Sequence, residues 1–198
     1  MKESWLEKQL QEAEKDPREQ AIQKMYKDMV KVTEPIRILP ISEVAEFDDY
    51  AVTKGVVGNR VNQGHMGATE ILPIRTDNAS DCNVFLIKTL KENGHIEYVL
   101  VHVWAGNLDL NRPGARRKDI AAITNETSLA IGITGGRSAS IVPTAREFKY
   151  EGITTVKHIH IPSGNRYVSV VYRPEDNNIL VRVGADTDAT EVYLYEGF

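Results

Sequence analysis

Cys82 is the only cysteine of the chain, and its surroundings are the best suited of any segment to covalent chemistry. It follows a predicted polar turn, residues 76–81 (TDNASD), which would present the thiol with little packing, and it precedes an apolar run, residues 84–87. Most lone cysteines are buried and inert. A thiol acts as a nucleophile only where a nearby base or cation favours its thiolate form. Whether Cys82 is a nucleophile or a structural residue therefore depends on its partner.

His102 is the histidine that the predicted strands bring closest to Cys82. Asn93-Gly94 is typical of a hairpin tip, so residues 82–90 and 96–104 are expected to pair as antiparallel strands. His102 then lies on the return strand, near the end at which Cys82 begins the first strand. We expect these two residues to form a nucleophile–base pair.

The length of the hairpin loop decides whether the two side chains share a face of the sheet. A two-residue turn would place Cys82 and His102 on opposite faces. A three-residue loop at 92–94 would pair Val84 with His102 and put both side chains on one face. If the loop is the shorter one, His65, which lies in a glycine-flanked loop, is the first replacement.

His158 and His160 occupy alternate positions in a predicted strand, KHIHIP, and so point to one face. A cupin-type metal site would need a carboxylate about four or five residues later, and IPSGN supplies none. We predict an ordinary strand face, with no metal and no organic cofactor. Gly135 and Gly136 are predicted to form a tight turn, because ITGGRS lacks the Gly-Lys-Ser/Thr ending of a phosphate-binding loop.

Hydrophobic periodicity divides the chain near residue 50. Before it, apolar residues recur at three and four, and Asp16-Pro17 is a typical helix start, so helices are predicted. After it, runs rich in valine, isoleucine, tyrosine and threonine predict strands. The predicted strands are 68–75, 82–90, 96–104, 129–134, 154–161, 167–173, 179–184 and 191–195, with short helices near 117–123 and 144–150.

These elements predict an α+β protein with a mainly antiparallel, β-sandwich-like core. Residues 1–50 are expected to form an N-terminal helical segment packed on the core. Residues 51–198 are expected to form the catalytic unit, with a few short helices on its outside.

The composition argues against several classes of partner. The chain of 198 residues carries a formal net charge of −4, whereas general binding to nucleic acids or anionic membranes needs a basic face. No apolar run approaches the length of a membrane span, and the first residues lack the apolar region of a signal peptide. Arg112, Arg116 and Arg117 form a local basic run that could dock an acidic patch on a protein substrate.

Cys82, His102 on the return strand and Thr76 six residues before the cysteine resemble the cysteine glutamine deamidases. This group includes the chemoreceptor deamidases of bacterial chemotaxis, the catalytic domain of cytotoxic necrotizing factors, and Burkholderia lethal factor. Residues 133–153 and 163–183 are similar to the glycine-rich turn, helix and closing hairpin of the chemotaxis enzymes. The resemblance covers roughly residues 68–184 and implies a β-sandwich with a catalytic Cys–His pair.

The sequence departs from these families beside the cysteine. Asp81 stands where they carry a small residue, and its carboxylate would tend to raise the thiol pKa. The spacing from Cys82 to His102 is longer than usual. The N-terminal helices have no counterpart in the chemotaxis enzymes and suit a toxin better.

The resemblance implies a protein-glutamine deamidase, made in a bacterial cytoplasm and then secreted or translocated into a host cell without a Sec signal peptide. His102 would hold Cys82 as a thiolate that attacks the glutamine carboxamide, and backbone N–H groups from Ser80 and Asp81 onward would stabilise the oxyanion. Thr76 would orient the imidazole. The partner would be a host protein with an exposed glutamine.

Three alternatives remain open from the sequence. The chain could be a chemotaxis-type receptor deamidase, which would use the same site. It could be a non-catalytic binding or immunity module in which Cys82 is structural. It could also be a cupin-like metal enzyme that uses His158 and His160.

Overall fold

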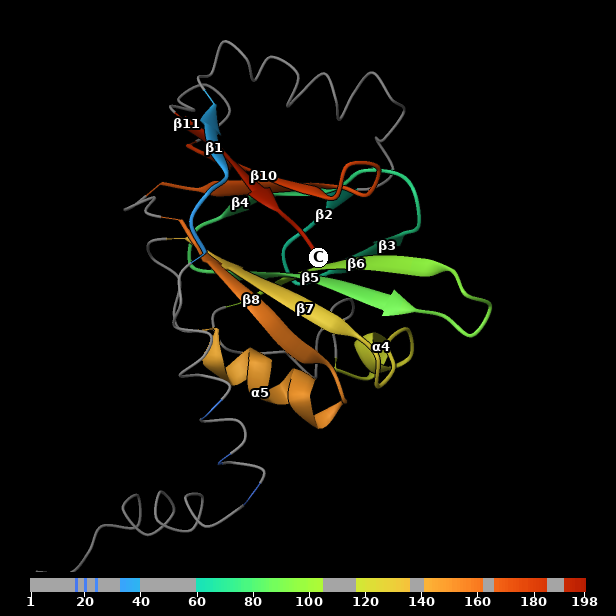
Figure 1. The fold of residues 1–198 in the computed structure, drawn as a ribbon. Helices are drawn as coiled ribbons and strands as arrows, with labels where there is room; N and C mark the ends of the chain where they lie inside the picture. Colours follow the sequence, from blue (N-terminus) through green and yellow to red (C-terminus); the bar gives the residue numbers. More distant parts are fainter. Residues whose placement is uncertain are drawn as a thin grey trace, which may run out of the picture.

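The computed structural model describes residues 33–39, 60–104, 117–135, 141–161, 166–184 and 191–198, together with Pro17, Gln20 and Lys24. The described residues form a β-rich α+β fold of two sheets and a few helical segments (Figure 1). Pro17, Gln20 and Lys24 are helical. The rest of the predicted N-terminal helices lies outside the described residues.

The first sheet has six strands, and only its β2–β4 pairing is parallel. The strand order is β1-β11-β10-β9-β4-β2, so β1, from the part of the chain before residue 50, pairs with the last strand. The strands are β1 (Arg37–Leu39), β2 (Arg60–Val61), β4 (Ile74–Ala79), β9 (Val168–Arg173), β10 (Asn178–Val183) and β11 (Glu191–Glu196).

The second sheet has five strands in the order β3-β6-β5-β7-β8, and only its β7–β8 pairing is parallel. A parallel pair needs a crossover connection, and α5 (Val142–Tyr150) lies between these two strands in the sequence. A shorter helix, α4 (Arg117–Ala121), precedes β7 in the sequence. The strands are β3 (Met66–Thr69), β5 (Asn83–Leu90), β6 (Ile96–Val103), β7 (Leu129–Thr134) and β8 (Thr154–His160).

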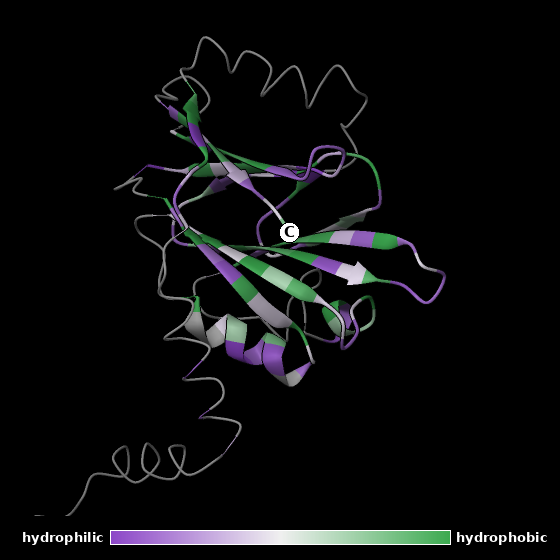
Figure 2. Cartoon of the chain, viewed as in Figure 1, coloured by the Kyte–Doolittle hydropathy of each residue, from purple (hydrophilic) through white to green (hydrophobic). Residues whose placement is uncertain are grey.

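Alternation along the strands builds two apolar clusters. On β5, Val84 and Leu86 contribute to a cluster shared with the six-stranded sheet, whereas Phe85 and Ile87 face a cluster that includes residues of α4 and α5. Figure 1 shows the five-stranded sheet between the other sheet and these two helices. In Figure 2 apolar and polar residues alternate along several strands, as expected where one face of a strand is more exposed than the other. We call the cluster shared by the two sheets the inter-sheet cluster, and the cluster between the five-stranded sheet and the helices the sheet–helix cluster.

Most predicted strands and both predicted short helices are confirmed to within a few residues. The single strand predicted at 68–75 is wrong. β3 ends at Thr69, Pro73 cannot donate a ladder hydrogen bond, and β4 begins at Ile74 in the other sheet. The polar segment from Thr76 to Ala79, predicted as a turn, is also part of β4.

The hairpin between β5 and β6 has a three-residue loop, the length that puts Cys82 and His102 on one face. Lys91 N donates to His95 O over 2.8 Å, and Gly94 takes a positive φ of 81°, which glycine adopts without strain. Val84 consequently pairs with His102. The odd register expected for a shared face is confirmed.

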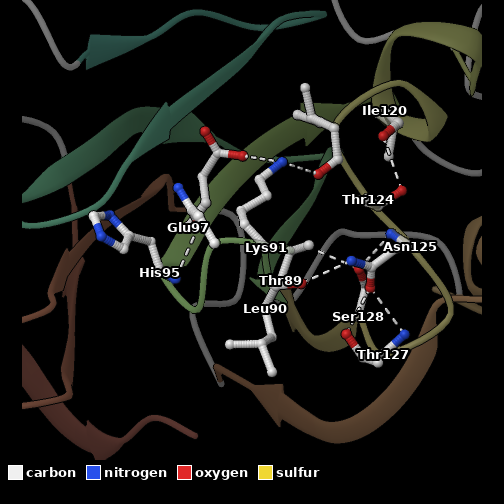
Figure 3. Close-up of polar contacts among 12 residues, drawn as sticks. Thr89, Leu90, Lys91, His95, Glu97, Ile120, Thr124, Asn125, Thr127 and Ser128 are labelled. Atoms are coloured by element: carbon white, nitrogen blue, oxygen red, sulfur yellow. Dashed lines mark hydrogen bonds and ion pairs between the residues drawn. The ribbon is translucent and has the colours of Figure 1, made fainter.

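Side chains at this end of the hairpin fix the loop to the segment after α4 (Figure 3). Lys91 Nζ donates to Ile123 O over 2.6 Å and forms an ion pair of 2.7 Å with Glu97. Asn125 Nδ2 donates to Leu90 O over 2.7 Å. A one-residue slip of the hairpin would break all three contacts, so they reinforce the register on which the site depends.

Candidate active site

Cys82 and His102 point into the same layer, between the two sheets. Cys82 belongs to the inter-sheet cluster, as do Val84 and Leu100. Val101 and Val103 belong to the sheet–helix cluster, so alternation along β6 turns His102 toward the inter-sheet side. Both residues are buried, with exposed fractions of 2% for Cys82 and 1% for His102.

Thr76 holds the His102 ring from the opposite sheet. Its hydroxyl donates to Val61 O over 2.7 Å, so it accepts the hydrogen bond from His102 Nδ1, also at 2.7 Å. Nδ1 then carries the ring proton, and Nε2 keeps a free lone pair. Nε2 is buried and has no hydrogen-bond partner among the described residues. The ring is thus presented as a base.

A bulge in β4 makes this arrangement possible. The pairing of β4 with β9 shifts between Thr76 and Ala79, and Asn78 takes a positive φ of 58°, which asparagine tolerates better than most residues. In a regular strand, residues three apart face opposite sides. Here both Thr76 and Ala79 are fully buried. The bulge therefore lets Thr76 face His102 while the chain turns through Ser80 and Asp81 to reach Cys82.

The surroundings favour a neutral imidazole. Burial lowers the pKa of His102 to about 4, and the Asp77 carboxylate opposes that shift only in part. Asp77 itself lies in ion pairs with Arg60 at 2.9 Å and Arg75 at 2.8 Å. At neutral pH His102 is therefore an unprotonated base.

Burial also raises the pKa of the Cys82 thiol, a hydrogen bond from Gln63 lowers it, and the Asp81 carboxylate raises it further. The net direction is upward. No hydrogen bond joins Cys82 Sγ to His102 Nε2, so the resting groups are a neutral thiol and a neutral imidazole on one face, whereas the sequence predicted a thiolate held by His102. The difference follows from desolvation, which disfavours both charged forms.

Gln63 is the residue of this site that the sequence reasoning missed as a participant. Its Nε2 lies 2.9 Å from Cys82 Sγ. It sits in a tight turn closed by His65 N donating to Asn62 O, with Gly64 at a φ of 78°. The sequence Asn62-Gln63-Gly64 is typical of a turn and could have been noted. A contact between this turn and Cys82, 19 residues away, could not be predicted from local sequence.

The same turn is attached to the backbone of His102. Gly64 N donates to His102 O over 2.7 Å, and His102 N donates to His65 O over 3.0 Å. The His65 ring is exposed and lies near its own loop, with Nδ1 3.0 Å from Gln63 O. His65 therefore contributes its backbone to the site.

Of the other predicted site residues, the structure describes Ser80, Asp81 and Arg117. Ser80 is half-buried and Asp81 is exposed, both directly before Cys82. Arg117 is the first residue of α4. Arg112, Arg116 and Gly136 lie outside the described residues.

His158 and His160 face away from the Cys82 layer, because Ile159 between them belongs to the inter-sheet cluster. Both rings contact the Thr134 hydroxyl, from His158 Nε2 at 2.9 Å and from His160 Nδ1 at 3.2 Å. In the described part of the chain, no three His, Cys, Asp or Glu side chains come together as a metal site would require.

A search with protein-family models found no match to the sequence, and no curated protein matches it. Within the described segments, no helix has the length and apolar character needed to cross a bilayer.

Replacing Thr76 with valine is expected to lower the activity of the site about 10- to 100-fold, a part of what general acid–base catalysis contributes. Valine keeps the shape but leaves His102 Nδ1–H and Val61 O unpaired. Thr76→Ser keeps the hydroxyl and serves as the matched control. Nitrogen NMR of the His102 ring should show the Nδ1–H tautomer in wild type and Thr76→Ser. A valine variant with the same tautomer and full activity would contradict this role.

Acid should destabilise the fold through His102. Its folded pKa of about 4 lies below its ordinary value, so between pH 6.5 and 4 the unfolded chain binds a proton that the folded chain refuses. This contribution to stability is complete above pH 6.5, and about 3 kcal/mol is lost as the pH falls to 4. Urea unfolding at several pH values, compared with His102→Asn, measures it. Equal pH slopes for the two proteins would contradict the prediction.

Proposed function

We propose that the protein is a protein-glutamine deamidase that uses Cys82 as nucleophile and His102 as base. The observation that carries the proposal is the hydrogen bond between Thr76 Oγ1 and His102 Nδ1, which leaves Nε2 unpaired on the face that Cys82 shares. A buried nitrogen without a partner is unfavourable for stability, so its retention suits a catalytic role. Support for a carboxamide substrate comes from Gln63, whose own carboxamide already lies against Sγ.

The neutral pair defines the order of events. As Cys82 Sγ attacks the glutamine carboxamide carbon, its proton passes to His102 Nε2, so thiolate forms only in the reacting complex. Backbone N–H groups from Ser80 to Cys82 stabilise the oxyanion. Protonated His102 then gives its proton to the departing ammonia. Water, deprotonated by the same ring, hydrolyses the thioester and leaves glutamate. The reaction needs no metal or organic cofactor.

The type of fold and the cellular setting belong to the same proposal. Two facing sheets that share an apolar cluster suit a β-sandwich of the deamidase kind, with the N-terminal helices packed on its outside. We place the activity in a bacterial toxin or effector that acts on a host protein after export. The residues of the basic run, Arg112, Arg116 and Arg117, would dock an acidic patch of that substrate.

A non-catalytic binding module is the second candidate, because Cys82 is 2% exposed and lies in the core cluster, as a structural cysteine would. In that case the thiol only fills space. The two candidates differ in whether Cys82 reacts with a carboxamide.

The test is ammonia release, with mass analysis for the change of glutamine to glutamate, on free glutamine, a glutamine peptide and folded host proteins. We expect one folded protein to be converted and free glutamine to be a very poor substrate, because a buried thiol admits only a carboxamide that a docked surface delivers. Comparable turnover of all three would indicate a general amidase. No conversion of any of them would favour the binding module.

Charge reversal in the basic run should act on substrate docking. Arg116→Glu with Arg117→Glu is expected to raise KM several-fold with a smaller change in kcat, because rim charges guide encounter more than they affect the reacting atoms. Steady-state kinetics with the folded substrate at low and moderate salt would measure it. Salt provides the control, because it screens rim charges, and a rise in KM that is equally large at low and moderate salt would contradict docking.

A further inference from the structure

The carboxamide nearest to Cys82 belongs to the chain itself. Gln63 Nε2 lies 2.9 Å from Sγ, and one more C–N bond of about 1.33 Å puts the carbonyl carbon Cδ no further than about 4.2 Å from the sulfur. Reacting atoms in productive complexes lie roughly 3–3.5 Å apart. Cδ would therefore have to move closer to the sulfur by at most about 1 Å to reach the attacking distance.

The backbone keeps this glutamine in place. The turn of residues 62–65 passes from β2 in one sheet to β3 in the other, and both of its hydrogen bonds to β6 involve the backbone of His102. Nearby, Gly67 lies so close to Val61 that an added Cβ would be 2.8 Å from its Cγ2. The turn is thus fixed to the residue that carries the base, so attack on Gln63 would need no docking step.

The other groups that acyl transfer needs are in the same layer. His102 Nε2 is buried and has no hydrogen-bond partner among the described residues, and Thr76 fixes the tautomer of the ring. Cys82 is covered, being 2% exposed, while Gln63 is an exposed residue whose amide contacts it. In this arrangement the Gln63 side chain holds the position that a substrate carboxamide must take.

We propose that Gln63 is an internal acyl donor, and that Cys82 forms a thioester with its side chain before any other substrate is bound. The bond from Sγ to Cδ forms as the Sγ proton passes to His102 Nε2. The Cδ–Nε2 bond then breaks, and the same proton leaves with the nitrogen as ammonia. Hydrolysis of this thioester by water leaves a glutamate side chain at position 63 and returns the free thiol.

The inference rests on the proposed nucleophilic role of Cys82, and it adds a first substrate and a modification site. While the thioester lasts, Cys82 is blocked to other substrates and to alkylating agents. After hydrolysis, a carboxylate replaces the amide that lay against the sulfur. Residue 63 would then no longer occupy the site as a carboxamide.

Peptide mapping of the full-length purified protein tests this directly. Trypsin cleaves after Arg60, Arg75 and Lys88, so Gln63 is the only glutamine of peptide 61–75, and Cys82 lies in peptide 76–88. We expect one of two products in wild type. Either peptides 61–75 and 76–88 are joined and about 17 Da lighter than their sum, with hydroxylamine separating them, or peptide 61–75 is about 1 Da heavier at residue 63.

Matched variants separate enzymatic conversion from spontaneous deamidation. Cys82→Ser and His102→Asn should lower conversion of Gln63 at least about 100-fold, and Gln63→Asn, one methylene shorter, should leave residue 63 unconverted. Circular dichroism checks that each variant folds, and His102→Asn replaces Cys82→Ser if the serine variant does not. Equal conversion in wild type and the variants would mean spontaneous deamidation and would overturn the inference.

The state of residue 63 and the ammonia released from added substrates together distinguish failure of this inference from failure of the proposed function. Unmodified Gln63 in a protein that deamidates a substrate overturns the inference and leaves the proposed function standing. Converted Gln63 without turnover of other substrates supports the inference and removes the proposed host target. Unmodified Gln63 with no ammonia from any substrate overturns both.

Discussion

Replacing Cys82 with serine is expected to lower the rate of glutamine deamidation on the order of 10⁴-fold or more, because no other residue of the described site can form the thioester. A serine hydroxyl would occupy the same position, but it is less acidic than a thiol, and His102, with a pKa of about 4, is a weak base for removing its proton. The rate is measured as ammonia released from the folded substrate. The same loss should appear in single-turnover experiments, in which no acyl-enzyme would accumulate.

The fold should tolerate this substitution, although for a different reason than the sequence suggested. Cys82 is not a thiol on a turn with little packing; it is part of the inter-sheet core. Serine is similar in size and can still accept the hydrogen bond from Gln63 Nε2, so we expect a loss of about 1–2 kcal/mol in the free energy of unfolding. Cys82→Ala, which removes that acceptor, is the control. A serine variant with full activity would remove Cys82 from the mechanism.

Replacing His102 with asparagine is expected to lower kcat about 10³- to 10⁴-fold, since one ring activates the thiol and protonates the departing ammonia. Asparagine can place an N–H where His102 Nδ1 donates to Thr76, but it has no atom at Nε2. The variant therefore separates the base from the hydrogen bond that holds it. KM for the folded substrate should change little, because His102 is buried.

The pH dependence of the wild-type reaction provides the control for this role. With the His102 pKa at about 4, the ring stays a base well below its ordinary pKa, so kcat/KM should hold on the acid side down to about pH 5. His102→Asn should lose that dependence together with the rate. An asparagine variant within about tenfold of wild type would mean that another group is the base, with His65 the first to test.

The parts of the site that depend on neighbours in the chain could be predicted from the sequence. Asn93-Gly94, flanked by apolar strands, predicted the β5–β6 hairpin, and its loop length fixes whether Cys82 and His102 share a face. Thr76 was predicted beside the ring, and it lies 2.7 Å from Nδ1. The hairpin follows from strand alternation and turn chemistry, which are local properties of the chain. Its register did not, because the sequence left a two-residue turn and a three-residue loop both open, and the structure has the longer one.

Contacts between segments that lie far apart in the sequence follow only from tertiary packing. Residues 74–79 read as the end of one strand and a turn, yet they form β4 in the opposite sheet, and β7 and β8 pair in parallel across α5. Gln63 reaches Cys82 only because its turn connects the two sheets. Pairing between distant segments depends on the whole arrangement of apolar faces, which no local pattern contains.

The protonation states of Cys82 and His102 also depend on tertiary packing. Cys82 and His102 in sequence suggested an ion pair, because proximity of a base to a thiol favours the thiolate. Packing of the second sheet over both residues removes them from water, and desolvation disfavours charge on each. The sequence therefore predicted the contact between Thr76 and His102, whereas burial between the sheets favours a neutral thiol at Cys82 and a neutral imidazole at His102.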